Sequence, residues 1–198
     1  GAEFSAVALD FAQGRDRFVP DKAEPVEPAD WRAYLRGMGA EMARRGVAGG
    51  GLNLAIAGSN PRGAGLSSSA SLCVALGRAL APAVPPPLPA RELALAAQAA
   101  EHDWAGVACG IMDQMAIAAG LPGHALLLDC RDLAVRQIPM PDDWAVLIVQ
   151  SGVTRGLVEG HYNARRADCK AATSAQPLCP SPSRHCRSMT AASTGSRP

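Results

Sequence analysis

The chain has 198 residues, of which 48% are hydrophobic, so it contains enough apolar material for one large globular domain or a domain and a half. Its 19 Lys and Arg residues nearly balance its 18 Asp and Glu residues, and the formal net charge is +1. So small a charge provides no field that would draw the chain onto nucleic acid or an anionic membrane, and we expect neither as a partner. A small molecule is the expected ligand.

The cysteines and the hydropathy pattern indicate a cellular setting. Six cysteines are scattered along the chain without a Cys-x-x-Cys pair, which argues against a structural zinc site. No apolar segment resembles a secretory signal, and no apolar run approaches the roughly 18 residues of a membrane span. The sequence therefore predicts a reduced, cytoplasmic protein without a membrane anchor.

The first part of the chain predicts two strands with a helix between them. Residues 3–11 carry apolar side chains at alternate positions, which is typical of a strand. Residues 31–45 carry them at three- and four-residue spacing, which predicts an amphipathic helix that ends at Gly46. Apolar and smaller side chains alternate again over 52–57, which predicts the second strand.

Helices and strands are also predicted in the rest of the chain. Helices are expected from Ser67 to the proline cluster at 82–89, over 91–108 and over 156–172. Strands are expected at 124–130, 134–138 and 145–150. The elements mix without the regular alternation of βαβ units, so the sequence favours an α+β fold over a doubly wound sheet.

The last 26 residues, 173–198, differ in composition from the rest of the chain. They contain no acidic residue, and 13 of them are Ser, Thr or Pro. A segment of this kind cannot bury a hydrophobic core. We therefore expect residues 1–172 to form the folded region and 173–198 to be either a disordered extension or the product of a shifted reading frame, of which we favour the second.

A glycine- and serine-rich run, Asn-Pro-Arg-Gly-Ala-Gly-Leu-Ser-Ser-Ser-Ala-Ser, lies at 60–71 between a predicted strand and a predicted helix. Glycines allow the backbone angles that close a loop around a ligand, and the unpaired N–H groups at a helix start attract an anion. Triphosphate is a natural occupant, and a serine hydroxyl can also ligate Mg²⁺. The spacing is equally compatible with a glycine turn before a serine-capped helix.

Three other known loops are excluded at this position. The chain has neither the G-x-x-x-x-G-K-[ST] loop of Walker-type nucleotide sites nor the G-x-G-x-x-G fingerprint of dinucleotide-binding folds. The elbow of the α/β hydrolases requires G-x-S-x-G, whereas the run Gly65 to Ser69 ends in serine.

The run at 60–71 resembles the phosphate-binding signature of the GHMP kinases, which are named for galactokinase, homoserine, mevalonate and phosphomevalonate kinases. Within that superfamily, later segments resemble galactokinases. They are Glu-His-Asp-Trp-Ala-Gly at 101–106, Cys-Gly-Ile-Met-Asp-Gln at 109–114, Gly-His-Ala-Leu-Leu-Leu-Asp-Cys-Arg at 123–131, and Tyr-Asn-Ala-Arg-Arg at 162–166. The resemblance covers about Glu3 to Ala172. It implies a GHMP-kinase-like N-terminal domain, of the ribosomal protein S5 domain 2-like fold, followed by the start of a second domain.

The resemblance also implies roles for individual residues. The residues implied to wrap the ATP phosphates are Gly63, Ala64, Gly65, Leu66, Ser67, Ser68 and Ser69. Ser69 and Glu101 would ligate Mg²⁺, and Asp113 would be the catalytic acid/base and contact the sugar. Tyr162 and the backbone of Gly110 would also contact the sugar, while Trp31 and Tyr34 would line the adenine pocket.

Taken singly, these residues have ordinary structural interpretations. Asp113 could be a capping or turn residue and Glu101 an exposed helix residue, while Trp31 and Tyr162 could be packing aromatics. Even as a catalytic group, Asp113 could either accept the proton of the sugar hydroxyl or only orient that hydroxyl.

The resemblance implies the ATP-dependent phosphorylation of galactose at its anomeric hydroxyl, by a monomer. The alternatives are a related kinase acting on N-acetylgalactosamine or arabinose, a sugar and ATP sensor that transfers nothing, and a truncated product without function. Galactokinases share an R-x-N-x-x-G-E-H-x-D type signature near the N-terminus and a glycine-rich signature near the C-terminus, and neither is found here. We therefore expect an incomplete copy whose isolated activity is impaired.

Overall fold

The structure is a computed structural model that describes residues 3–47, 50–61, 64–81, 88–149 and 161–175. Its contacts divide the chain into two units, 1–162 and 163–198. Among the described residues, no helix has both the length and the apolar character that crossing a membrane requires.

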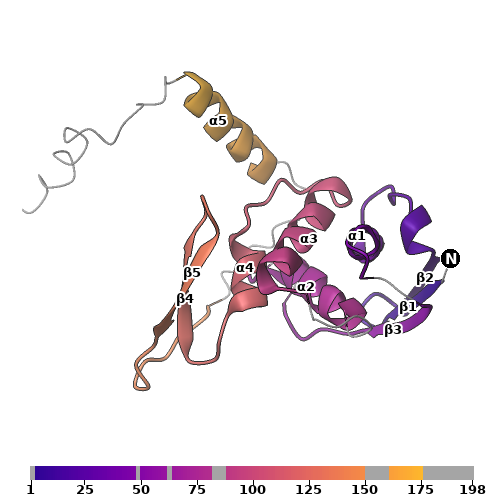
Figure 1. The fold of residues 1–198 in the computed structure, drawn as a ribbon, viewed down its shortest axis with the longest axis horizontal. Coiled ribbons are helices and arrows are strands. Elements are labelled where there is room, and N and C mark those ends of the chain that lie inside the picture. Colours follow the sequence, from indigo (N-terminus) through magenta and orange to yellow (C-terminus); the bar gives the residue numbers. More distant parts are fainter. Residues whose placement is uncertain (1–2, 48–49, 62–63, 82–87, 150–160, 176–198) are drawn as a thin grey trace, which may run out of the picture. The chain divides into compact units, whose positions relative to one another are not determined.

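A three-stranded sheet forms one layer of the first unit (Figure 1). The central strand β1 (Phe4–Ala8) pairs antiparallel with β2 (Gly14–Phe18) and parallel with β3 (Leu52–Ile56). The predicted strand at 52–57 is therefore confirmed, and the one predicted at 3–11 is shorter than expected.

Strand β2 was not predicted, because it reads Gly-Arg-Asp-Arg-Phe and lacks the apolar alternation of a typical strand. Its two inward positions are Asp16 and Phe18, each 8% exposed, and only the second is apolar. The guanidinium of Arg36 donates to both Asp16 oxygens at 2.8 Å, so the buried carboxylate is fully paired. A buried ion pair thus replaces the apolar residue that a sequence pattern requires.

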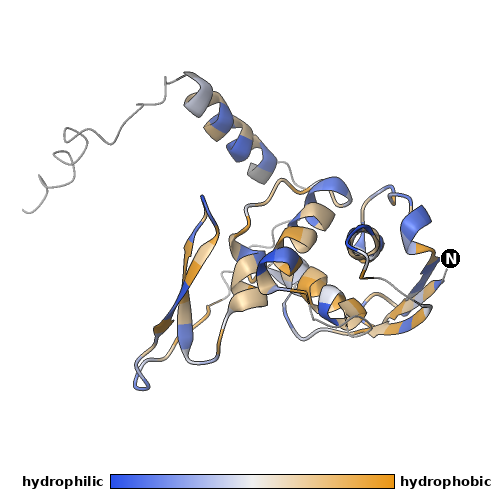
Figure 2. Ribbon diagram, viewed as in Figure 1, coloured by the Kyte–Doolittle hydropathy of each residue, from blue (hydrophilic) through white to orange (hydrophobic). Residues whose placement is uncertain are grey.

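Helices pack against this sheet. A short 3-10 turn, η1 (Pro20–Lys22), precedes α1 (Trp31–Arg44), and α2 (Ser68–Leu80) and α3 (Ala90–Asp103) follow. Helix α1 begins where the Asp30 carboxylate accepts a hydrogen bond from the Arg32 backbone at 2.8 Å. Figure 2 shows mostly hydrophobic residues on α2, which packs against both α1 and α3. The predicted helix at 31–45 is confirmed, and the helix expected from Ser67 starts one residue later.

The hydrophobic core lies between these helices and the sheet. Leu35, Met38 and Met42 of α1 are completely buried there, together with Phe4 of β1 and Leu93 of α3. These side chains fix the distance between α1 and α3, and α3 also carries Glu101.

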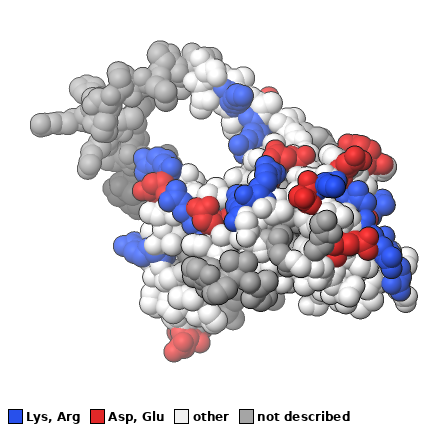
Figure 3. Space-filling view, turned by 45° about the vertical axis from the view of Figure 1, so that its right-hand side comes forward, with Lys and Arg blue, Asp and Glu red and all other residues white. Residues whose placement is uncertain are grey.

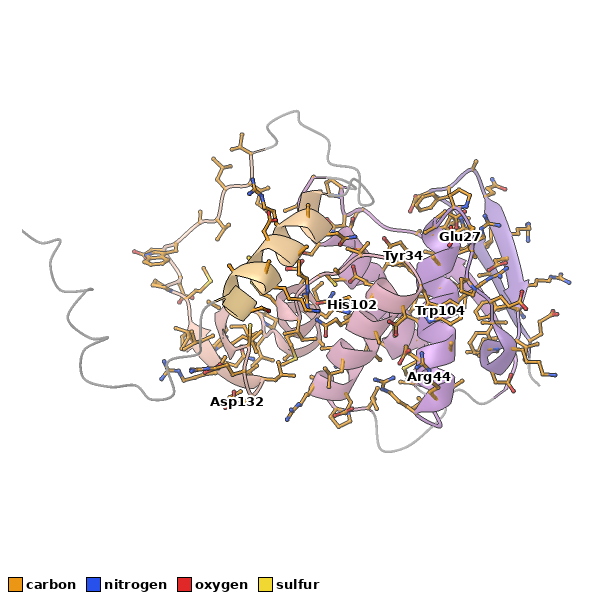
Figure 4. The ribbon with its side chains drawn as sticks, turned by 90° about the horizontal axis from the view of Figure 1, so that it is seen from above. Glu27, Tyr34, Arg44, His102, Trp104 and Asp132 are labelled. Atoms are coloured by element: carbon orange, nitrogen blue, oxygen red, sulfur yellow. The ribbon has the colours of Figure 1, made fainter. Side chains whose placement is uncertain are left out.

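Gly37 packs closely against the end of α3. A Cβ atom at this position would lie 2.8 Å from Cγ of Trp104, the residue that caps α3 (Figure 4). The Cβ and Cγ atoms of Trp104 lie next to its backbone, so they cannot move away without shifting that backbone. We therefore expect Gly37→Ala to lower the free energy of unfolding by about 1–3 kcal/mol. A denaturant midpoint measures this loss.

The matched control is Gly58→Ala. Gly58 has open space where its Cβ would stand, so its substitution is expected to change stability by less than about 0.5 kcal/mol. Equal stability of the two variants would contradict the packing described for Gly37.

The segment after α3 differs from the sequence prediction. The helix expected over 91–108 ends at Asp103, because Gly106 takes a left-handed φ of +69° and the Val107 amide donates to the Glu101 carbonyl at 2.9 Å. An unpredicted helix, α4 (Met112–Ala119), follows this loop. Its eight residues are too few to show a clear helical period.

A β-hairpin follows α4. Strands β4 (His124–Asp129) and β5 (Ala134–Pro139) pair antiparallel, which confirms both predicted strands. The strand predicted at 145–150 is wrong for its described part, because residues 145–149 form no strand and Val146 to Val149 are 64–85% exposed. Their apolar character suggests a buried strand, but a strand needs a neighbour to pair its backbone groups.

Helix α5 (His161–Ala175) lies mostly in the second unit. The first five residues of the helix predicted at 156–172 lie outside the described residues, and so do 176–198. The described helix continues three residues past the predicted domain boundary at 172. The interpretation of 173–198 as a separate tail remains a prediction.

The described surface carries charges of both signs. Figure 3 shows acidic and basic side chains interspersed on one face rather than gathered into a field of one sign. Such a surface agrees with the small net charge of the chain.

Candidate functional site

A pocket of about 450 Å³ opens where the start of α1, strand β3 and one face of α2 meet. Its wall is mostly apolar and includes Phe11, Trp31, Leu54, Ile56, Leu72 and Leu76. Its polar lining comes mainly from around the start of α2 and includes Asn60, Ser68, Ser69 and Ser71. An apolar hollow of this size with a few grouped polar residues is typical of small-molecule sites.

The two aromatic residues predicted to line an adenine pocket both contribute to this wall. Trp31 is 7% exposed and lies beside Phe11, with 6.2 Å between the ring centroids. Tyr34 stands one turn further along α1. Burial raises the pKa of its hydroxyl, and the charge of Glu101 raises it further, so Tyr34 is protonated and can donate a hydrogen bond.

The loop before α2 has the backbone conformation that an anion cradle needs. Gly65 has a φ of +74°, and Ser67, at the N-cap, is left-handed with a φ of 54°. The Asn60 side-chain amide donates to the Leu66 carbonyl at 3.0 Å and holds the loop closed. Ala64 and Leu66 are half-buried here, whereas Gly63 lies outside the described residues.

The serine at the N-cap does not cap the helix. The side chain of Ser67 makes no capping hydrogen bond to α2, so the simple serine-capped helix that the spacing allowed is not what the structure shows. A helix start without a side-chain cap leaves first-turn N–H groups available to a bound anion. Ser68 and Ser69, in that first turn, both line the pocket.

Glu101 connects this helix start to α3. Its side chain is buried, with the residue only 2% exposed, and its Oε1 accepts a hydrogen bond from Nε2 of Gln114 at 2.6 Å. Burial raises the pKa of Glu101, against the lowering effect of polar contacts from Ser69 and Gln114. The structure thus brings together Ser69 and Glu101, the two predicted metal ligands, which are 32 positions apart in the chain.

Asp113 is close to this cluster but outside the pocket lining. It lies in the first turn of α4, half-buried, and its negative charge also raises the pKa of Glu101. Gly110 is in the loop directly before α4. The side chain of Tyr162 lies outside what the structure describes, so its contact with a sugar remains a prediction.

The oxygen atoms of Ser69 and Glu101 suit Mg²⁺, which prefers hard oxygen ligands and keeps several waters. Within the described ranges, no three His, Cys, Asp or Glu side chains group closely enough to hold a metal by themselves. The residues therefore fit an ion that takes its other ligands from phosphate and water.

The raised pKa of Glu101 predicts a pH effect on stability. Because the folded state holds this proton more tightly than the unfolded state, Glu101 stabilises the fold below its ordinary pKa of 4.5, and this contribution is lost as pH rises through the folded-state value. We expect the melting temperature of Glu101→Gln to rise relative to wild type as pH increases through this window. Glu92→Gln, at an exposed position of α3, is the control. A difference between E101Q and wild type that does not vary with pH would contradict the expectation.

Sequence reasoning assigned no role to Gln114 or Asn60. Gln114 lies in the segment 109–114 that resembles galactokinases, but its contact with Glu101 depends on the unpredicted helix α4. Asn60 had a visible signal, since an asparagine directly before a proline often starts a turn.

The comparisons with known proteins agree with this geometry. Residues 33–121 match the family described as GHMP kinases N terminal domain, and this segment contains the α2 loop, Ser69, Glu101 and Asp113. This match confirms the resemblance to the GHMP kinases and, with the mixed helices and strands of the structure, the expected α+β fold.

A solved structure gives a more specific comparison than the family match. The chain is similar to the galactokinase of Lactococcus lactis, whose crystal structure is a complex with galactose. The two share 30% identity with a TM-score of 0.74, over 87% of this chain and 45% of the galactokinase. This chain therefore spans less than half the length of that relative.

Proposed function

We propose that the chain is the ATP-binding part of a kinase that phosphorylates galactose at its anomeric hydroxyl, with galactose 1-phosphate and ADP as products. One observation carries the proposal: the pocket joins an apolar, aromatic wall to an uncapped helix start beside Ser69 and Glu101. The similarity to a galactokinase solved with galactose supports the choice of sugar.

The pocket has the two environments that a nucleoside triphosphate needs. A purine base can lie against the apolar wall near Trp31 and Tyr34, where flat aromatic contacts are favourable. The phosphates then extend toward the loop at 64–67 and the first turn of α2, whose N–H groups and positive helix end stabilise negative charge. Glycine at position 65 permits the backbone to approach the phosphates closely.

In this proposal, Ser69 and Glu101 hold Mg²⁺. Bound there with ATP, the ion would supply positive charge that offsets the negative charge of the phosphates. The Ser69 hydroxyl binds at the pocket surface, while the buried Glu101 carboxylate supplies the negative charge from α3. One hydroxyl and one carboxylate suffice for an ion that keeps several waters.

Asp113 is the proposed partner of the sugar. The anomeric oxygen forms a bond to the γ-phosphorus while the bond from that phosphorus to the bridging oxygen of ADP breaks, and the hydroxyl proton passes to the Asp113 carboxylate. The backbone of Gly110, directly before α4, and Tyr162 are proposed to bind the sugar. We place the reaction in the cytoplasm and in a monomer, and the free thiols at Cys73, Cys130 and Cys169 favour a reducing setting.

The test combines binding and turnover. Calorimetry of the chain with ATP and Mg²⁺ is expected to show nucleotide binding, and a coupled assay is expected to show ADP release that depends on galactose, at the impaired rate expected of an incomplete copy. N-acetylgalactosamine and arabinose, assayed in parallel, identify the sugar, and binding without release for any of the three sugars would indicate a sensor. The proposal is refuted if the chain binds no nucleotide and releases no ADP with any of the sugars.

A further inference from the structure

Gln114 and Glu101 make a hydrogen bond in the interior of the first unit. Gln114 is 1% exposed and Glu101 is 2% exposed, and Nε2 of the amide lies 2.6 Å from Oε1 of the carboxylate. The same Nε2 lies 3.3 Å from Sγ of Cys109. Two polar side chains from different helices are thus committed to each other away from solvent.

This arrangement leaves one polar atom of Gln114 unsatisfied. Oε1 of Gln114 is buried and has no hydrogen-bond partner in the described structure. Burial without a partner penalises a polar atom, so an amide is a costly side chain for filling this space. The amide therefore contributes something other than packing, and its one strong contact is with the Glu101 carboxylate.

That contact fixes the orientation of Glu101. A carboxylate can rotate about its last bond, and a short hydrogen bond to one oxygen determines where the other oxygen points. Ser69 contacts the same carboxylate from α2, while Gln114 reaches it from the first turn of α4. Asp113 precedes Gln114 in that turn, so a single amide links the placement of Asp113 to that of Glu101.

We propose that Gln114 is a positioning residue, which holds the Glu101 carboxylate in the orientation that Ser69 and Glu101 need in order to bind Mg²⁺ together with a nucleotide. This role rests on the proposed function. Residues that orient a metal ligand typically contribute about 10–100-fold to metal affinity when they are removed.

The decisive variant is Gln114→Met, which keeps the side-chain length and removes the amide. Calorimetry on the whole chain measures the affinity for ADP over a series of Mg²⁺ concentrations. In Q114M, the Mg²⁺ concentration that gives half of the metal-dependent gain in affinity is expected to rise by about 10–100-fold. The affinity for ADP without Mg²⁺ is expected to stay the same, because Gln114 does not line the pocket.

The matched control is Gln98→Met. Gln98, on α3, donates to the Cys109 carbonyl at 3.3 Å, so its substitution removes an amide from the same region without touching Glu101. Q98M is expected to keep the wild-type Mg²⁺ dependence. If thermal denaturation shows that Q114M is unfolded, Gln114→Asn, which withdraws the amide from Glu101, must show the same shift.

The outcomes separate the two proposals. A folded Q114M with wild-type Mg²⁺ dependence, or an equal shift in Q98M, overturns the positioning role and leaves the kinase proposal intact. A wild-type chain whose affinity for ADP does not respond to Mg²⁺ overturns the positioning role together with the assignment of Ser69 and Glu101 as Mg²⁺ ligands, and the kinase proposal is then decided by the assay of ADP release.

Discussion

Replacing Asp113 with asparagine is expected to lower the turnover of sugar-dependent ADP release by about 10²–10⁴-fold. The substitution keeps the size and polarity of a half-buried side chain in the first turn of α4 but removes its ability to accept a proton. Asp113 lies outside the lining of the pocket, so the affinity for Mg²⁺ and ATP is expected to stay close to the wild-type value. Steady-state kinetics and calorimetry on the same preparation measure the two quantities.

Asp103→Asn is the matched control for this experiment. Asp103 is the exposed last residue of α3, so its substitution removes one negative charge from the same part of the chain without altering the cluster around Glu101. Turnover by this variant is expected to equal that of wild type. A D113N variant that keeps wild-type turnover would exclude the proton-accepting role and leave Asp113 with only an orienting role.

The elements that could be predicted from the sequence have apolar side chains that repeat with a clear period. The helix at 31–45 and the strand at 52–57 are of this kind, and both are found close to the predicted positions. Strand β2 was missed because one of its two buried positions is an aspartate paired with Arg36, a residue 20 positions away. The run at 145–149 led to a wrong prediction because apolar composition does not reveal whether a pairing strand is present.

The candidate site also has a part that the sequence could predict and a part that only the fold shows. The loop at 60–71 is contiguous in the chain, so its glycines and serines were visible as one motif, and the match of 33–121 to the GHMP kinases confirms the resemblance. The contact of Ser69 with Glu101, in contrast, depends on the packing of α2 against α3. The resemblance implied that pairing, but only the fold shows that Gln114 holds the same carboxylate.

Filling the pocket is expected to abolish nucleotide binding. Ala75 lies one turn beyond Ser71 on the face of α2 that lines the pocket, and its side chain is exposed there. Because this position is open, α2 can accept the indole of Ala75→Trp without overpacking the core, and the indole then occupies space that a base would need. We expect the dissociation constant for ATP to rise by about 100-fold or more, which corresponds to about 2.7 kcal/mol or more of binding free energy.

Two comparisons locate the cause of this loss. Arg91→Trp adds the same side chain at an exposed position in the first turn of α3, outside the pocket lining, and is expected to bind ATP like wild type. Tripolyphosphate, which has no base, is expected to bind A75W and wild type equally. The reason is that the proposed phosphate site is at the start of α2, whereas Ala75 lines the pocket further along this helix. If A75W bound ATP normally, the base could not lie in this pocket. If it lost tripolyphosphate as well, the substitution would have disturbed the start of α2 itself.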